Sequence, residues 1–334
     1  YLTNSIFYLI GKLNWLVNNM NKILILEGGF NEEHEVSLKT AKEVKKILKK
    51  NKIKYESILV DPKNFKNKIK KYSNNLVLFN ALHGPFGEDG KIQSILKMNK
   101  YKFTHSSVSS SKNCFNKITS KKKLSKYRIQ TPLFIKVNPK NLNEKYLNKI
   151  KKSFGQFVIK PNESGSSYGI KIIKNDIDFE NLIKELNLYK KKIKHHKSLV
   201  LEKYINGKEL TVSVLDIQNK TIPLEVTEIK SKNEFFDYEA KYTKGFSKHI
   251  LPAKIPNNTY KKCLEVALKA HKILECNIIS RSDFIYDYKN KEIFYLETNT
   301  QPGLTSISLV PEQAKYKNIS FEKIVLELIK NFNE

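Results

Sequence analysis

The chain has 334 residues, a length typical of two or three domains. Its residues are 40% hydrophobic and 11% aromatic, a composition that excludes a disordered chain. The net charge of +28 is typical of nucleic-acid binding, but lysine is spread along the whole chain and only Arg128 and Arg281 are arginines, which indicates a residue-usage bias instead. Three widely spaced cysteines, Cys114, Cys263 and Cys276, exclude a disulfide framework and indicate a reducing compartment.

Residues 1–19 begin without Met and contain a short apolar run, from Ile6 to Val17, that polar residues interrupt. The run is too short for a membrane-spanning helix and has no signal-peptide features. We expect an upstream extension with Met20 as the working start. No other segment has the apolar length to span a membrane, so we expect no membrane association.

From Met20 onward, apolar strands alternate with helices. A first strand ends at Gly28 and Gly29, and further strands are predicted at 55–60 and 75–80. The helix after the first strand has apolar residues at helical spacing, namely Val36, Ala41, Val44 and Leu48. This alternation predicts a parallel sheet with ligands at the carboxyl ends of its strands.

Two loops, at 28–35 and 80–93, follow these strands. The second contains three of the twelve glycines in the chain, which indicates a tight backbone or a close ligand. Taken singly, His83 in this loop is typical of a structural histidine, and Glu35 of a charge at a helix start.

The middle of the chain contains two strand pairs. A Ser- and Asn-rich passage and a lysine-rich helix at 116–126 come first; then FVIKP (157–161) predicts a strand that ends near Lys160. A Gly/Ser loop follows, which suits phosphate binding or a plain turn. Residues 198–215 predict two strands around a turn at Asn206–Gly207, with Glu202 and Glu209 facing it. This pattern suits an adenosine site or an ordinary hairpin.

The segment 233–249 is aromatic and charged, which is typical of a loop that orders over a ligand. Helices are predicted at 259–274 and 320–332. Between them, Asp283 precedes Glu297 and Asn299, which share one strand face because side chains alternate along a strand. Two carboxylates and an amide oxygen suit Mg²⁺ with substrate phosphates. The alternative is solvated residues beside a hairpin turn. Arg281 suits a carboxylate or an oxyanion.

Seven segments occur in a recognisable order: GGFNEEHEVSL (28–38), LHGPFGEDGKIQ (82–93), VIKPNESGSSYGI (158–170), LEKYINGKELTV (201–212), FFDYEAKYTKG (235–245), SRSDF (280–284) and LETNTQPGLTSISLVP (296–311). Together they resemble the D-alanine–D-alanine ligases of the ATP-grasp superfamily. The resemblance implies an α/β protein with a Rossmann-like parallel-sheet domain at 20–104. It also implies a central ATP-grasp domain at 105–201 and a C-terminal ATP-grasp domain at 202–334, with an ω-like loop and the metal site.

The resemblance further implies the ATP-dependent ligation of two D-alanines through an acylphosphate, for peptidoglycan synthesis. The cofactors would be ATP and two Mg²⁺ or Mn²⁺ ions, and the enzyme would be a cytoplasmic homodimer with no specific nucleic-acid partner. Such a reaction depends on positioning and charge stabilisation more than on acid–base chemistry, because a carboxylate is a poor electrophile until it is phosphorylated.

The resemblance also implies a role for each matching residue. Catalytic roles fall to Glu35, which receives the ammonium of the first D-alanine with the help of a hydrogen-bond chain through Ser166 and Tyr242, and to Arg281 and Gly303, which stabilise the oxyanion. Substrate-binding roles fall to His83, Lys241, Ser308 and Leu309. ATP contacts fall to Lys117, Lys160, Glu202, Lys203, Ile205 and Glu209. Metal ligation falls to Asp283, Glu297 and Asn299.

Three positions depart from the family pattern: Ile278 replaces Gly, Leu304 replaces Met and Ile307 replaces His. None is a proposed metal or phosphate ligand, so we expect an active enzyme. The pair Lys241–Tyr242 favours the D-alanyl dipeptide. Two alternatives stay open, namely a D-alanine–D-lactate or other ligase that differs near Ile307, and a basic nucleic-acid-binding protein.

Overall fold

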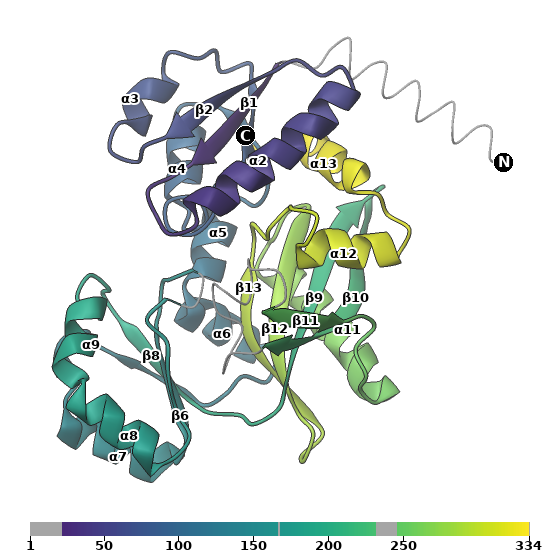
Figure 1. The fold of residues 1–334 in the computed structure, drawn as a ribbon. Coiled ribbons are helices and arrows are strands. Elements are labelled where there is room, and N and C mark those ends of the chain that lie inside the picture. Colours follow the sequence, from purple (N-terminus) through teal and green to yellow (C-terminus); the bar gives the residue numbers. More distant parts are fainter. Residues whose placement is uncertain (1–21, 166–167, 232–245, 334) are drawn as a thin grey trace.

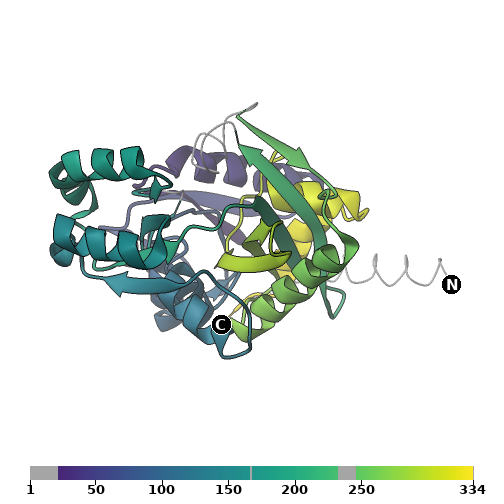
Figure 2. The same cartoon turned by 90° about the horizontal axis from the view of Figure 1, so that it is seen from below.

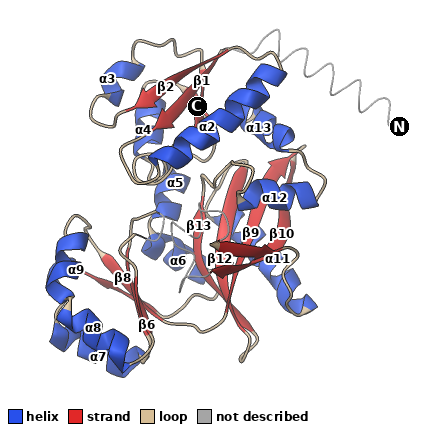
Figure 3. Ribbon diagram, in the orientation of Figure 1, coloured by secondary structure: helices blue, strands red, loops and turns tan. Residues whose placement is uncertain are grey.

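The computed structural model describes residues 22–165, 168–231 and 246–333, which form three sheets with helices packed on them (Figure 1, Figure 3). The predicted extension 1–19 lies outside the described residues. None of the helices in the described ranges has the length and apolar character that a membrane crossing requires.

The N-terminal sheet is parallel, as the alternation of strands and helices predicts. Its strands lie in the order β2-β1-β3-β4, with bounds β1 (Ile23–Gly28), β2 (Tyr55–Val60), β3 (Val77–Asn80) and β4 (Lys102–Phe103). Its helices are α2 (His34–Lys50), α3 (Phe65–Ile69) and α4 (Lys91–Met98). Helix α2 buries the four apolar residues that its spacing singled out, Val36, Ala41, Val44 and Leu48. The predicted α/β class and the parallel N-terminal sheet are therefore confirmed.

The central sheet is antiparallel, in the order β5-β8-β6-β7. Its strands are β5 (Phe134–Val137), β6 (Phe157–Pro161), β7 (Lys171–Ile173) and β8 (Leu199–Lys203), and its helical segments are η1 (Pro139–Asn141), α7 (Glu144–Phe154), α8 (Asp176–Lys184) and α9 (Leu186–Ile193). Helices α7 to α9 gather on one face of this sheet (Figure 1, Figure 2), where their apolar residues share a core with Phe157, Ile159 and Leu201. The opposite face is left to line a cavity.

The C-terminal sheet is also antiparallel, in the order β11-β10-β9-β12-β13. Its strands are β9 (Lys208–Ile217), β10 (Lys220–Ser231), β11 (Ser247–Ile250), β12 (Ile279–Asp287) and β13 (Glu292–Asn299). The remaining helices are α5 (Val108–Phe115), α6 (Lys117–Ser125), α11 (Asn257–Ile273), α12 (Leu309–Tyr316) and α13 (Phe321–Lys330). Helix α11 packs on β9, β10, β12 and β13, while α5 and α6 pack on β13. The predicted domain boundaries at 104/105 and 201/202 stay predictions.

Strands β8 and β9 do not form the hairpin that an ordinary reading of 198–215 would give. Strand β8 pairs with β5 and β6, whereas β9 pairs with β10 and β12, so residues 204–207 carry the chain from one sheet to the next. A Cβ atom on Gly207 would lie only 2.2 Å from the carbonyl oxygen of Tyr286, so the crossing requires glycine there.

The sequence of helix α5, VSSSKNCF, has no apolar periodicity that predicts a helix. Local capping explains its formation, because the side chain of Ser107 accepts a hydrogen bond from the backbone N–H of Ser110. Asn116 caps the next helix, α6, in the same way through the N–H of Thr119. The two caps place Cys114 and Lys117 at the junction between the helices.

The N-terminal and C-terminal sheets share one hydrophobic core. Ile23 and Phe79 of the first sheet belong to the same buried cluster as Leu215 and Ile279 of the third, together with Leu328 of α13. Helix α13 contacts α2, and Asn333 forms a backbone bridge with Phe103 of β4. The end of the chain therefore fixes the first sheet relative to the third.

We predict that Leu328→Ala lowers the free energy of unfolding by about 2–5 kcal/mol, because Leu328 is fully buried in this shared core. The matched control is Leu188→Ala on α9, where the leucine is 68% exposed and the change should stay within about 0.5 kcal/mol. Urea denaturation of both variants measures the difference. Equal losses would show that α13 does not support the shared core.

Candidate active site

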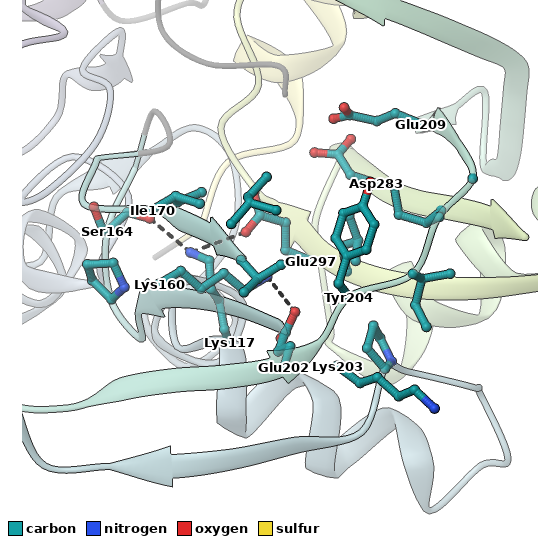
Figure 4. Close-up of a pocket in the computed structure, with 18 of the residues that line it drawn as sticks. Lys117, Lys160, Ser164, Ile170, Glu202, Lys203, Tyr204, Glu209, Asp283 and Glu297 are labelled. Carbon is teal, nitrogen blue, oxygen red and sulfur yellow. Dashed lines mark hydrogen bonds and ion pairs between the residues drawn. The ribbon is translucent and has the colours of Figure 1, made fainter. Parts of the chain in front are cut away.

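A cavity of about 210 Å³ lies between the central and C-terminal sheets. We call it the inter-sheet cavity (Figure 4). Its charged lining comes from both sheets and from α6, and its walls include apolar side chains. The charged residues are Lys117, Lys160, Glu202, Lys203, Glu209, Asp283 and Glu297, and the apolar ones include Val158, Ile170, Ile172, Ile205, Ile285 and Leu296.

Two lysines place positive charge on one side of the inter-sheet cavity. Lys117, the first residue of α6, donates a hydrogen bond to the carbonyl oxygen of Ser164 at 2.9 Å, and its Nζ lies 3.2 Å from Glu297 Oε2. Lys160 Nζ lies 2.8 Å from Glu202 Oε2 (Figure 4). Both lysines are largely buried, so their charges act in a medium of low dielectric and suit an anionic ligand.

Glu202 is held by a second lysine that the sequence analysis did not single out. Lys121 is fully buried, and its Nζ lies 3.0 Å from Glu202 Oε1 and donates to the carbonyl oxygen of Tyr295. Burial alone would raise the pKa of Glu202, but Lys121 and Lys160 outweigh it and lower that pKa. Burial lowers the pKa of Lys121 to about 8. The carboxylate therefore stays ionised between two cations.

A smaller cavity of about 60 Å³ adjoins the inter-sheet cavity and shares four lining residues with it, Lys117, Ser164, Gly165 and Glu297. The other residues of the smaller cavity come from the N-terminal and C-terminal sheets, from their loops and from α5, and they include Glu33, His83, Glu88, Cys114, Arg281, Asn299 and Gly303. The smaller cavity thus brings together charged residues that the sequence places more than 200 positions apart.

Glu33, and not the predicted Glu35, reaches the smaller cavity. Glu35 is exposed on the first turn of α2, whereas Glu33 is buried and lines the cavity. Cβ atoms on Gly84 and Gly165 would lie 2.3 and 2.8 Å from Glu33 Oε2, so two glycines make room for this carboxylate. Glu33 precedes the helix and Glu35 lies within it, and the sequence EEHE gave no signal to choose between them. The position of Glu35 therefore does not support its predicted contact with a substrate, and Glu33 is the carboxylate that the cavity contains.

Hydrogen bonds tie the loop of Glu33 to the loop of His83. Asn31 donates to the carbonyl oxygens of His83 and Pro85 at 2.8 and 3.1 Å, and its own side-chain oxygen accepts from the N–H of Glu33. His83 Nε2 lies 2.9 Å from Thr40 Oγ1 on α2. The two loops at the carboxyl ends of β1 and β3 therefore form one rigid wall, as the parallel sheet predicts.

The predicted metal ligands and Arg281 are neighbours across β12 and β13. Arg281 pairs with Asn299, and Asp283 pairs with Glu297, in the strand register. The guanidinium of Arg281 donates to both oxygens of Asp283, at 2.9 and 2.8 Å. The register shifts after Asp283, and both Leu296 and Glu297 line the inter-sheet cavity. Such a β-bulge re-aims side chains beside a functional site.

Gln301 joins the end of β13, the strand with the predicted metal ligands Glu297 and Asn299, to the N-terminal sheet. Its side-chain nitrogen donates to the carbonyl oxygens of Asn80 and Leu82 at 2.8 and 2.6 Å, and its side-chain oxygen accepts from Asn80 Nδ2 at 2.8 Å. The N–H of Gln301 donates to Asn299 Oδ1 at 2.7 Å. The glutamine is buried, so these bonds fix Asn299 relative to the loop of His83.

The remaining predicted residues fall into two groups. Lys203 and Ile205 line the inter-sheet cavity, although the Lys203 side chain points away from the other labelled residues (Figure 4). Ser308 and Leu309 line neither cavity, and Ser308 Oγ instead lies 2.8 Å from Thr305 Oγ1. The predictions for Ser166, Lys241 and Tyr242 lie outside the described residues.

The three departures from the family pattern have different surroundings. Ile278 is buried with φ +62°, a left-handed conformation that glycine adopts more easily, and Asp216 holds it by hydrogen bonds to its N–H and carbonyl. Leu304 is buried in the shared core. Ile307 is half exposed beside Ser308. Ile278 therefore keeps a strained backbone at the start of β12.

The oxygen atoms of Asp283, Glu297 and Asn299 fit a hard divalent cation. The described residues hold no group of three or more His, Cys, Asp or Glu side chains able to bind a metal. The two carboxylates are paired with Arg281 and Lys117, and the Asn299 oxygen with an N–H. Such a set suits Mg²⁺ that is shared with phosphate oxygens more than a metal held by protein alone.

Comparisons with known proteins agree on one family. The D-ala D-ala ligase C-terminus family model matches residues 124–330. The chain is 43% identical to a D-alanine–D-alanine ligase from Wolbachia pipientis wMel, over 92% of this chain and 93% of the relative. It is 40% identical to a D-alanine–D-alanine ligase from Pelagibacter ubique, over 93% of this chain and 97% of the relative.

Two solved structures share the fold over nearly the whole chain. A D-alanine–D-alanine ligase from Bacillus anthracis, complexed with ATP, superposes with a TM-score of 0.75 at 28% identity and covers 94% of this chain and 97% of its own. The VanG D-Ala:D-Ser ligase from Enterococcus faecalis gives 0.73 at 28% identity, over 93% of this chain and 99% of its own.

We predict that Gln301→Met lowers the free energy of unfolding by about 1–3 kcal/mol, because it removes three buried hydrogen bonds, namely those to the carbonyl oxygens of Asn80 and Leu82 and the one from the Asn80 side-chain amide. Gln130→Met is the matched control, since Gln130 is exposed and its single hydrogen bond to Glu292 should contribute less than about 0.5 kcal/mol. Denaturant unfolding measures both. A loss for Gln301→Met no larger than the control's would contradict a role in joining the sheets.

Proposed function

The chain belongs to the D-alanine–D-alanine ligase family, and from this premise we propose that its inter-sheet cavity binds ATP and its smaller cavity binds the first D-alanine. The enzyme has the family's activity, the ATP-dependent joining of two D-alanines for peptidoglycan synthesis, and it has the ATP-grasp fold. The observation that carries the assignment is that three lysines and four carboxylates, drawn from two sheets and from α6, line one cavity.

The inter-sheet cavity has the chemistry that a nucleotide requires. Apolar side chains from both sheets supply walls for the adenine ring. Glu202 and Glu209 stand at the ends of β8 and β9, where carboxylates suit the adenine amine and the ribose hydroxyls. Lys117 and Lys160 suit the phosphates. The backbone of Lys203 and Ile205 completes the proposed adenosine contacts.

Asp283, Glu297 and Asn299 would hold Mg²⁺ or Mn²⁺, with phosphate oxygens as further ligands; two ions are proposed. When bound, the metal would neutralise the negative charge that phosphoryl transfer concentrates on the phosphate oxygens. Arg281 and Lys117 now occupy the two carboxylates. We propose that both cations turn toward the nucleotide and the reacting group when the carboxylates take up the metal.

In the smaller cavity, Glu33 would accept the ammonium group of the first D-alanine, with His83 in the same wall. The D-alanine carboxylate would then point toward the inter-sheet cavity, because the two cavities share Lys117, Gly165 and Glu297. A buried carboxylate that meets a substrate ammonium gains more than it would in water, since the local dielectric is low. This geometry orients the donor for phosphorylation.

The chemistry proceeds in two displacements. A carboxylate oxygen of the first D-alanine attacks the γ-phosphorus of ATP, the bond to the bridging oxygen breaks, and ADP leaves with that electron pair. The amine of the second D-alanine then attacks the acylphosphate carbon, and phosphate leaves from the tetrahedral intermediate as the amine loses a proton. Arg281 and the N–H of Gly303, which line the smaller cavity, would stabilise the oxyanion.

Other assignments rest on the resemblance alone. Ser308 and Leu309 would hold the carboxylate of the second D-alanine, Lys241 would reach the γ-phosphate, and Ser166 with Tyr242 would connect to the ammonium site. A cytoplasmic homodimer that recognises no specific nucleic acid stays part of the proposal. The net charge of +28 does not define a nucleic-acid-binding segment, because the lysines are spread along the chain.

The product distinguishes this proposal from its nearest alternatives. We predict that protein beginning at Met20 releases phosphate from ATP and Mg²⁺ when D-alanine is present but not with L-alanine, and that mass spectrometry identifies D-alanyl-D-alanine. D-lactate or D-serine added beside D-alanine tests the acceptor. Preferential formation of D-alanyl-D-lactate or D-alanyl-D-serine would overturn the acceptor assignment and direct attention to Ile307 and Ser308.

We predict that Glu33→Gln lowers kcat/KM for D-alanine by about 10- to 100-fold, because a charged hydrogen bond to the substrate ammonium becomes neutral. Glu35→Gln is the matched control two residues away, and its exposed side chain should leave kcat/KM within about twofold. Steady-state phosphate release at saturating ATP measures both. A large loss in Glu35→Gln with an active Glu33→Gln would restore the original assignment.

A further inference from the structure

Lys121 is a buried cation that touches the proposed ATP site only through other protein groups. It lies on α6, has no exposed surface and does not line the inter-sheet cavity. Its Nζ lies 3.0 Å from Glu202 Oε1 and 3.3 Å from the carbonyl oxygen of Tyr295, and it also lies near the rings of Phe134 and Tyr295. The lysine is therefore held in place between the central and C-terminal sheets.

Glu202 thus has one cation on each oxygen, and only one of them can reach the cavity. Lys160, 2.8 Å from Glu202 Oε2, lines the cavity, whereas Lys121 on Oε1 does not. Glu202 Oε1 is buried beside Lys121, whereas Oε2 faces Lys160, which lines the cavity. The two cations therefore differ in their access to a bound ligand.

We propose that Lys121 is a positioning residue that keeps Glu202 ionised and oriented when Lys160 turns from Glu202 to the nucleotide phosphates. The inference rests on the proposed function of Lys160 and Glu202. A carboxylate that is 2% exposed cannot lose its only cation without a large cost, because solvent does not replace the lost charge. With Lys121 fixed behind it, Glu202 keeps a partner in both states of the site.

Loss of Lys121 should affect the ATP-bound protein more than the free protein. In free Lys121→Met, Lys160 still neutralises Glu202, so the fold keeps a balanced pair. In the ATP complex of that variant, Lys160 must serve both Glu202 and the phosphates. The loss therefore falls on ATP binding more than on folding. The other charged groups that face Lys121 are Glu202 on β8, Lys160 on β6 and Glu297 on β13.

The test measures the dissociation constant of ATP with Mg²⁺, in the absence of D-alanine, by isothermal titration calorimetry. Lys121→Met should weaken ATP binding by about tenfold or more, because the buried Glu202 carboxylate would have no cation left when Lys160 turns to the phosphates. The KM for D-alanine at saturating ATP should change less than about twofold. Lys122→Met, the exposed neighbour on the same helix, is the matched control and should bind ATP like the unaltered protein.

A double-mutant cycle separates the charge effect from a general loss of structure. In Glu202→Gln, the acidic partner is gone, so adding Lys121→Met should weaken ATP binding by less than about threefold. Lys121→Gln, which is neutral but keeps a donor for the Tyr295 carbonyl, should resemble Lys121→Met. It also replaces that variant if Lys121→Met does not fold.

Three results would overturn the inference. One is ATP binding in Lys121→Met and Lys121→Gln that equals that of the unaltered protein. Another is an equal loss on adding Lys121→Met with and without the Glu202 carboxylate. The third is a loss confined to D-alanine. If the unaltered protein bound no ATP, the assignment of the cavity would fail instead, which is a separate outcome.

Discussion

A carboxylate withdrawn from water needs a cation beside it, and the proposed active site is built on three such carboxylates. Lys121 and Lys160 hold Glu202, Lys117 holds Glu297, and Arg281 holds Asp283. Each of these ion pairs places a buried lysine or arginine near a cavity. A nucleotide and its metal can exchange partners with these groups, so the ligand-free arrangement already contains the charges that phosphoryl transfer uses.

These pairs have their geometry because the sheets that carry them are fixed. The first and third sheets share one core, and Gln301 bonds the end of the metal-ligand strand to the loop of His83. The central sheet has a core of its own under α7 to α9. The proposed D-alanine site is therefore fixed relative to the predicted metal ligands, while the proposed nucleotide site lies between the sheet with its separate core and the rest of the molecule.

Backbone crowding decides which of two neighbouring glutamates serves the site. Gly84 and Gly165 come from different loops, and both stand where a Cβ would collide with Glu33. Asn31 bonds the loop of Gly84 to that of Glu33, and Glu33 lines the cavity while Glu35 faces solvent from α2. The GGFNEEHEVSL motif therefore predicted the segment that reaches the cavity, and the fold showed which of its glutamates does so.

The sequence by itself determined the parallel N-terminal sheet, the apolar face of α2, the hairpin of β12 and β13 and the family, because each depends on local spacing or on motif order. Only the tertiary structure decided that β8 and β9 belong to different sheets, that α5 is a helix and that Lys121 and Gln301 contact Glu202 and Asn299. Lys121 is one lysine among many in the sequence, and it becomes distinctive through burial beside Glu202 from a distant strand. Contacts between segments far apart in the chain leave no local pattern, so the motifs predicted candidate site residues, and only the fold showed which side chains contact them.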